Sequence, residues 1–187
     1  MDFRLKHIIV QLFLLLSVGF APVQARAQDI SIHLAEIPDG LILVYERSNG
    51  SLFSKKFVGQ TPDGYQVEWY VGDMQGSPTR IAFLDSQGNT LRYTSMSGKS
   101  RVYTPHYCNR TLGTCRLELV DQYGNRNSMT VTTRATLDGF SQAQVTPGEI
   151  DFSHRITLGI YGIRTFELKD DGRTIRLLRS YLVGYTS

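Results

Sequence analysis

The sequence predicts an all-β protein whose antiparallel strands form a meander, either closed into a barrel or curled into a half-open one. Two observations lead to this fold class. Apolar and polar residues alternate over many short segments, and turns rich in Gly, Asn and Asp separate those segments. The chain also lacks a long amphipathic pattern that would indicate a helix. A sandwich of two β-sheets is the alternative fold that the same pattern allows.

Residues 1–27 have the features of a secretory signal peptide. Arg4 and Lys6 precede an apolar run over residues 8–20, and Ala25-Arg26-Ala27 supplies the small residues of a cleavage site. The run is shorter than the roughly 20 apolar residues of a membrane-spanning helix. No later stretch is longer, so we expect no transmembrane helix in the mature chain.

Cleavage between Ala27 and Gln28 would leave one β-rich domain over residues 28–187. We expect this domain in the periplasm or outside the cell. The whole chain carries 20 Lys and Arg against 17 Asp and Glu. Because the leader removes more basic than acidic residues, the mature domain is close to neutral, which argues against a nucleic-acid partner.

The two cysteines, Cys108 and Cys115, both lie in the mature region. An exported chain with two cysteines is expected to pair them, and the turn-forming residues between them predict a hairpin with the disulfide across its neck. His106 and Cys108 also have the i, i+2 spacing of metal ligands on a strand. The disulfide would consume both thiolates, so we assign no metal site.

Strands are predicted wherever the alternation has a period of two residues. In the segment 65–71 the apolar residues Tyr65, Val67, Trp69 and Val71 enclose polar ones. The same pattern recurs over 117–119, 129–135 and 156–168. The run 41–45 is apolar throughout, which indicates a strand covered on both faces. In total we expect about nine or ten strands.

Turn signals separate these strands. Residues 48–51 (Ser-Asn-Gly-Ser) form a hairpin signal, and residues 170–172 (Asp-Asp-Gly) form another. Residues 84–89 and 120–125 share one pattern: an apolar residue, Asp, two further residues, Gly and Asn. A short helix is possible within 30–36.

The segment 138–145 fits neither state clearly. Residues 146–148 (Thr-Pro-Gly) interrupt the chain before its last strands. The break leaves too little sequence for a second domain.

Catalytic motifs are missing from the sequence. The mature chain has three histidines, His33, His106 and His154, which we interpret as ordinary surface or rim residues. No motif places one of them beside a nucleophile, so we assign no catalytic and no cofactor-binding residues. If the protein is instead a hydrolase of envelope polymers, the candidates are Glu149, Asp151 and His154, which lie close together in the sequence.

Arginine is used far more than lysine in the mature chain. Arg164 is the notable case, because its position in the alternation puts it on the apolar face of its strand. A guanidinium there would suit an anionic group.

These observations favour an exported, non-catalytic β-domain that binds an apolar or amphipathic small molecule or an envelope partner. A curved antiparallel sheet leaves a concave apolar face on which such a ligand can lie. An eight-stranded outer-membrane barrel is one alternative, although most of the apolar runs are short for it. The hydrolase is the other. The sequence does not identify the ligand residues.

Overall fold

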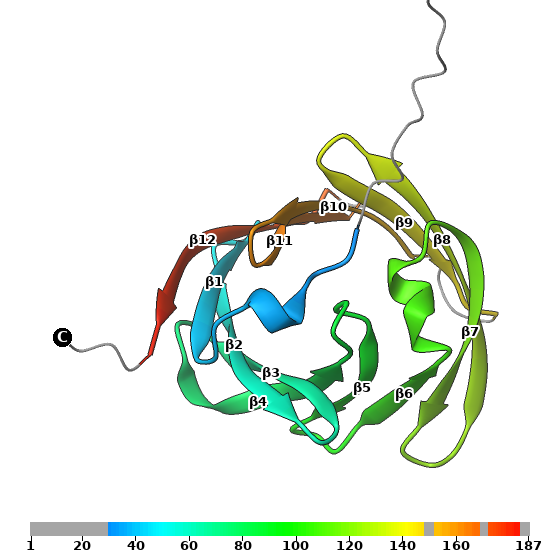
Figure 1. Cartoon of the computed structure of the whole chain (residues 1–187), viewed down its shortest axis with the longest axis horizontal. Helices are drawn as coiled ribbons and strands as arrows, with labels where there is room; N and C mark the ends of the chain where they lie inside the picture. Colours follow the sequence, from blue (N-terminus) through cyan, green and yellow to red (C-terminus); the bar gives the residue numbers. More distant parts are fainter. Residues whose placement is uncertain (1–29, 148–151, 169–171, 184–187) are drawn as a thin grey trace, which may run out of the picture.

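The computed structural model describes residues 30–147, 152–168 and 172–183, in which the strands form a ring (Figure 1). In chain order the elements are η1 (Leu34–Glu36), β1 (Leu41–Arg47), β2 (Leu52–Thr61), β3 (Gly64–Val71), β4 (Gln75–Leu84), β5 (Thr90–Ser95), β6 (Ser100–Thr104), η2 (His106–Arg110), β7 (Gly113–Asp121), β8 (Arg126–Thr136), β9 (Gly139–Val145), β10 (Phe152–Gly159), β11 (Gly162–Leu168) and β12 (Thr174–Leu182). The expected cleavage site at Ala27 and Gln28 lies outside the described residues, as do Glu149, Asp151 and part of the 170–172 turn.

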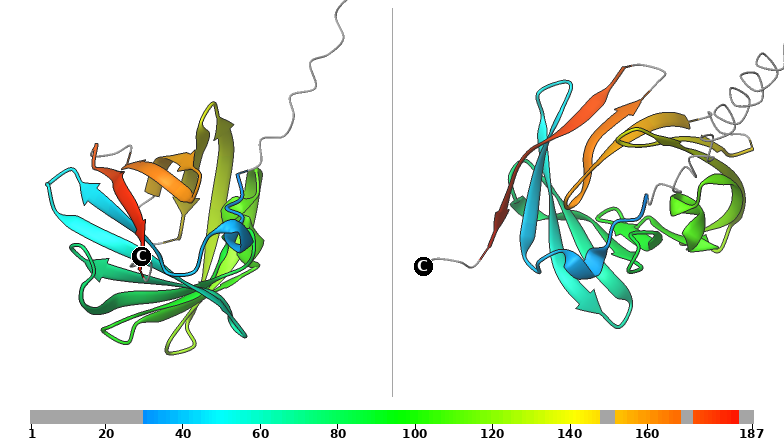
Figure 2. Two further views of the ribbon diagram at one scale, coloured as in Figure 1. Left: turned by 60° about the vertical axis from the view of Figure 1, so that its left-hand side comes forward. Right: turned by 45° about the horizontal axis from the view of Figure 1, so that its top comes forward.

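The sheet is a closed antiparallel barrel, so the barrel prediction is confirmed and the sandwich alternative is wrong. Each strand pairs with its neighbours in sequence, and β1 pairs with β12 to close the ring. Both views in Figure 2 show β12 beside β1. The described strands number 12 rather than nine or ten. β5 and β6 carry few apolar residues and therefore gave a weak alternation signal. The undecided segment 138–145 is almost entirely strand β9.

The alternation in sequence becomes an inner and an outer face of the barrel. Val67 and Trp69 of β3 point inward, whereas Gln66 and Glu68 point outward. Strand β1 is buried on both faces over residues 41–45, as expected. The β3–β4 loop crosses the outer face of β1, because it bonds to both neighbouring strands. The Met74 amide donates to Ser54 Oγ of β2 at 2.9 Å, and Asp73 accepts a hydrogen bond from Arg179 of β12.

Two short segments lie inside the ring (Figure 1). The N-terminal segment 30–40 includes η1, which is only three residues long and shorter than the possible 30–36 helix. Its backbone is fixed to the β4–β5 turn, since Ile32 N donates to Gln87 O and Leu34 N donates to Ser86 O, both at 3.0 Å. The second segment is η2, on the side of β7 and β8.

The disulfide between Cys108 and Cys115 is present, but the hairpin expected around it is wrong. Cys108 belongs to η2 and is fully buried, while Cys115 lies on β7. β6 and β7 do pair, yet the residues between them fold into the barrel as η2 instead of forming a tight turn. The disulfide therefore fastens η2 to the inner wall, with the two Cα atoms 5.4 Å apart.

The described pairing between β11 and β12 is short. Their pairing covers only Thr165–Glu167 against Thr174–Arg176 within the described residues. A register shift in the β10–β11 pairing follows Thr157, so Ile163 takes the inward position. Arg164 is exposed as a result, and its expected place on the apolar face is wrong because simple alternation does not anticipate a bulge.

Candidate functional site

The barrel encloses a cavity of about 140 Å³, which we call the inner cavity. Its wall is largely apolar and aromatic, and the N-terminal segment closes one side of it through Ile32 and Leu34. Tyr161 and Ile163 line the side toward β11. Two basic side chains, Lys55 and Arg110, also line it.

Lys55 enters the inner cavity because of its place on β2. It shares the inward face with Phe53 and Phe57, and its cross-strand partner on β3 is Trp69. Its ammonium nitrogen lies 5.0 Å from the ring centre of Tyr45 and 5.5 Å from that of Trp69. Such cation–π contacts attract the charged form.

Among the described residues, no carboxylate pairs with Lys55. In the described part of the chain Lys55 makes cation–π contacts but no hydrogen bond or ion pair. Burial lowers the pKa of Lys55 to about 8, and the nearby positive charges of Arg110 and Arg80 contribute to the shift. Lys55 is therefore still mainly protonated at neutral pH, although it loses its proton more readily than an exposed lysine.

Arg110 is the last residue of η2 and is held in the interior by the neighbouring disulfide. Its guanidinium carbon lies 5.3 Å from the ring centre of Phe140. One of its nitrogens, Nη1, is buried without a hydrogen-bond partner among the described residues. Burial lowers the pKa of Arg110 to about 10, although the charge of Asp85 opposes the shift. Arg110 remains charged at neutral pH.

Asp85 is the acidic group near these cations, but the β4–β5 turn already uses its oxygens. Oδ1 accepts the backbone amides of Gln87 and Asn89 at 3.0 and 2.8 Å, and Oδ2 accepts the Asn89 side chain at 2.8 Å. His106 Nε2 also lies near Oδ2, at 3.5 Å. None of the described residues that line the inner cavity is acidic. The inner cavity therefore has an excess of positive charge.

A second hollow of about 370 Å³ lies at one mouth of the barrel and shares Trp69 with the inner cavity. Arg47 and Arg80 line it, each stacked on an aromatic ring, that of Phe53 or Tyr93. The charge at this mouth has the same sign as in the interior.

His154 lies on the inner face of β10 and is buried, so its assignment as a surface or rim histidine is wrong. Its ring stacks on Phe166 with centroids 4.8 Å apart and also contacts Phe152. Burial lowers the pKa of His154 to about 4, with a smaller contribution from the charge of Arg110. The imidazole is neutral at physiological pH, and its Nδ1 has no hydrogen-bond partner within the described ranges.

The sequence analysis missed both cavity cations. Lys55 had a recognisable signal, since it alternates with Phe53 and Phe57 and must share their inward face. Arg110 had none, because its position depends on η2 folding into the barrel. The three histidines do not form a cluster: His33 belongs to the N-terminal segment, His106 contacts Asp85, and His154 is on β10.

Comparisons with protein-family profiles, with curated proteins and with solved structures give no match for this chain. None of the helices in the described ranges has the length and apolar character needed to cross a membrane. The disulfide is compatible with a location outside the cytoplasm. The chemistry of the inner cavity is therefore the main guide to function.

Proposed function

We propose that this protein is an exported, non-catalytic binding protein that holds a small amphipathic anion inside its barrel. The observation that carries the proposal is the unbalanced pair of cations, Lys55 and Arg110, in an otherwise apolar cavity. A buried charge without a partner is costly. A carboxylate or a similar anionic group would accept hydrogen bonds from both side chains, and an apolar body would fit the aromatic wall.

The outer face of the barrel supports a binding protein over an outer-membrane barrel. Outward positions on β3 and β7 carry Gln66, Glu68, Arg116 and Glu118. Glu118 also forms an exposed ion pair with Arg126 at 2.7 Å. Lipid-facing strand positions would instead be apolar.

His154 gives the hydrolase alternative little support. Its ring is packed between aromatic side chains, and with a pKa of about 4 it is a weak base at neutral pH. A general base works best with a pKa near the operating pH.

Calorimetric titration with benzoate tests the proposal, because the anion has one carboxylate and a body of suitable size for the inner cavity. We expect Lys55→Met to weaken binding by about tenfold to a hundredfold, the loss typical of a hydrogen bond to a charged group. Lys56→Met is the matched control, since Lys56 is the next residue on β2 and faces outward. Equal affinities for the two variants and the unmodified protein would overturn the proposal.

Binding should also depend on pH in a defined direction. Lys55 loses its proton near pH 8, so the affinity for benzoate falls as the pH rises through that value. Arg110 stays charged there, and burial keeps the Tyr45 hydroxyl protonated by raising its pKa. The anion should in turn raise the pKa of Lys55, so binding near pH 8.5 takes up protons. Titration in buffers of different ionisation enthalpy measures this uptake, and Lys55→Met should abolish it.

The stability of the empty protein provides a separate check. Lys55 has a lower pKa in the folded than in the unfolded chain, so its charge destabilises the fold at neutral pH. Lys55→Met should therefore raise the free energy of unfolding in urea while it weakens binding. A loss of both would indicate a structural role instead.

Export is part of the proposal and has its own test. The predicted leader over residues 1–27 and the disulfide support it. N-terminal sequencing of the protein recovered from the extracytoplasmic fraction should begin at Gln28. A chain that retains Met1 would argue against this part of the proposal.

A further inference from the structure

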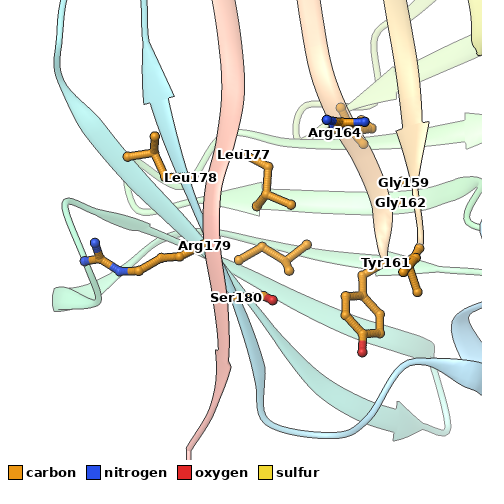
Figure 3. A pocket seen from close by; sticks show the side chains of 11 residues that line it. Gly159, Tyr161, Gly162, Arg164, Leu177, Leu178, Arg179 and Ser180 are labelled. Carbon is orange, nitrogen blue, oxygen red and sulfur yellow. The ribbon is translucent and has the colours of Figure 1, made fainter.

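A groove of about 410 Å³ runs along the wall between β11 and β12, and we call it the lateral groove (Figure 3). It begins where the pairing of the two strands stops, after Arg176. Leu177 and Ser180 line it from β12, and Tyr161 lines it from the β10–β11 turn. In Figure 3 the side chains of Leu177 and Tyr161 lie on the two sides of this opening.

The lateral groove adjoins the inner cavity. Tyr161 and Ile163 line both of them. The Ile163 carbonyl oxygen accepts a hydrogen bond of 2.9 Å from the hydroxyl of Tyr45, which reaches it from β1. Because the hydroxyl satisfies this carbonyl group, the wall can stay open here without an unpaired buried acceptor.

The two spaces differ in size and chemistry. The inner cavity, at about 140 Å³, is close to the size of a cavity that holds a benzene ring and takes only a small group beside Lys55. The lateral groove is larger, at about 410 Å³, and its surface is mainly apolar. Arg164 and Arg179 line the lateral groove as well, but apolar atoms still make up most of its surface. The mouth lined by Arg47 and Arg80 is another way out, and its surface is more polar, which suits an apolar chain less well.

We propose that the ligand is a linear alkyl carboxylate or a similar acyl anion, with its charged end beside Lys55 and its chain extending into the lateral groove. This inference rests on the proposed function and adds the shape of the ligand. The apolar chain would cover Leu177 and the exposed Ile160, both of which line the groove.

A series of unbranched carboxylates from hexanoate to dodecanoate tests the inference by calorimetry, with each acid below its micelle concentration. We expect the affinity to rise about two- to fourfold for each added methylene, as for a chain that leaves water. Ser180→Glu places a charge in the lateral groove and should reduce this increment while leaving hexanoate nearly unaffected.

Ser95→Glu is the matched control, because Ser95 lines the arginine mouth instead of the lateral groove. If it reduces the chain-length increment and Ser180→Glu does not, the chain leaves through the mouth and the inference is overturned. The inference is also overturned if Ser180→Glu weakens hexanoate and dodecanoate equally, since that indicates charge repulsion alone.

Failure of this inference differs from failure of the proposed function. If benzoate binding depends on Lys55 but the affinity for carboxylates does not change with chain length, the proposed acyl ligand is wrong and the proposed anion site still stands. The absence of binding for both benzoate and dodecanoate would remove both proposals.

Discussion

Two turns of the barrel have the same local structure in opposite surroundings. In the 85–89 and 121–125 turns, Asp Oδ1 accepts two backbone amides and Oδ2 accepts the side-chain amide of the Asn four residues later. The first turn lies under the N-terminal segment, with Gly88 and Asn89 buried. The second is exposed to solvent. The hydrogen bonds within a turn therefore follow from its own sequence, whereas its burial depends on contacts with the rest of the protein.

The contacts of the first turn connect it to the inner cavity. Gln87 and Ser86 accept the backbone amides of the N-terminal segment, whose Ile32 and Leu34 close the cavity. The second turn joins β7 to β8, and Gln122 Oε1 accepts the backbone amide of Ser100 at the start of β6. Among the described residues, none from this turn lines the inner cavity. Changes in the first turn should therefore affect both stability and ligand binding, and changes in the second should affect stability alone.

The largest contrast is expected from Gly88→Ala and Gly124→Ala. Both glycines have φ near +81°, so each alanine carries the same backbone penalty, about 1–2 kcal/mol. A Cβ at Gly88 would also lie 2.9 Å from Ile32 Cβ, whereas at Gly124 it would meet nothing within 4 Å. We expect Gly88→Ala to lose about 2–4 kcal/mol of unfolding free energy in urea, and Gly124→Ala about 1–2 kcal/mol.

Benzoate titration sharpens this contrast. Gly88→Ala should weaken binding because it displaces Ile32 from the inner cavity, and Gly124→Ala should leave binding unchanged. Equal losses of unfolding free energy in the two variants would show that Ile32 moves away from the new methyl group at no cost in free energy.

A smaller contrast is expected from Asn89→Ala and Asn125→Ala. Both variants lose the hydrogen bond to the turn aspartate, but only Asn89 is fully buried. Loss of a buried bond to a charged group costs about 1–3 kcal/mol, and we expect less than about 1 kcal/mol at the exposed site. Thermal unfolding of the two variants side by side measures the difference. A larger loss for Asn125→Ala would contradict the burial argument.

The smallest effect is expected from the titration of Asp121. The Asn125 side-chain hydrogen bond, followed by backbone amides, holds the pKa of Asp121 below its ordinary value of 3.8. The carboxylate thus stabilises the fold above that value, and this contribution is lost as the pH falls through the lower folded-state pKa. Carboxyl ¹³C NMR should show the pKa rising toward 3.8 in Asn125→Ala. An unchanged pKa would mean that the backbone amides alone hold it down.

The same comparison explains how far sequence reasoning reaches. The Asp-Gly-Asn pattern predicted both turns, and the alternation in β3, β7 and β8 predicted the inner face of the wall, because each signal acts within a few residues. The burial of the 85–89 turn had no local signal. It depends on the N-terminal segment, which is more than 50 residues earlier in the chain.

The residues of the candidate site also differ in whether a local sequence signal or a tertiary contact determines their position. Lys55 was accessible to pattern reasoning, since a lysine that alternates with phenylalanines must face inward with them. Arg110 depends on a segment folded into the barrel, and Arg164 depends on a register shift of one residue. Insertions and bulges of this kind follow from tertiary contacts and not from periodicity.

The two borders of β12 differ in the extent of their pairing. Seven residue pairs join it to β1, and the Asp73 carboxylate of the β3–β4 loop also binds Arg179 and Tyr181 from outside. Among the described residues, three pairs join it to β11. If β12 separates from one neighbour in a fluctuation, it should separate from β11 and stay paired with β1. Deuterium uptake should then be faster for amides along the β11–β12 border than for those along the β1–β12 border. If the protein binds the ligand that we propose, this border would let it enter while the rest of the barrel stays folded.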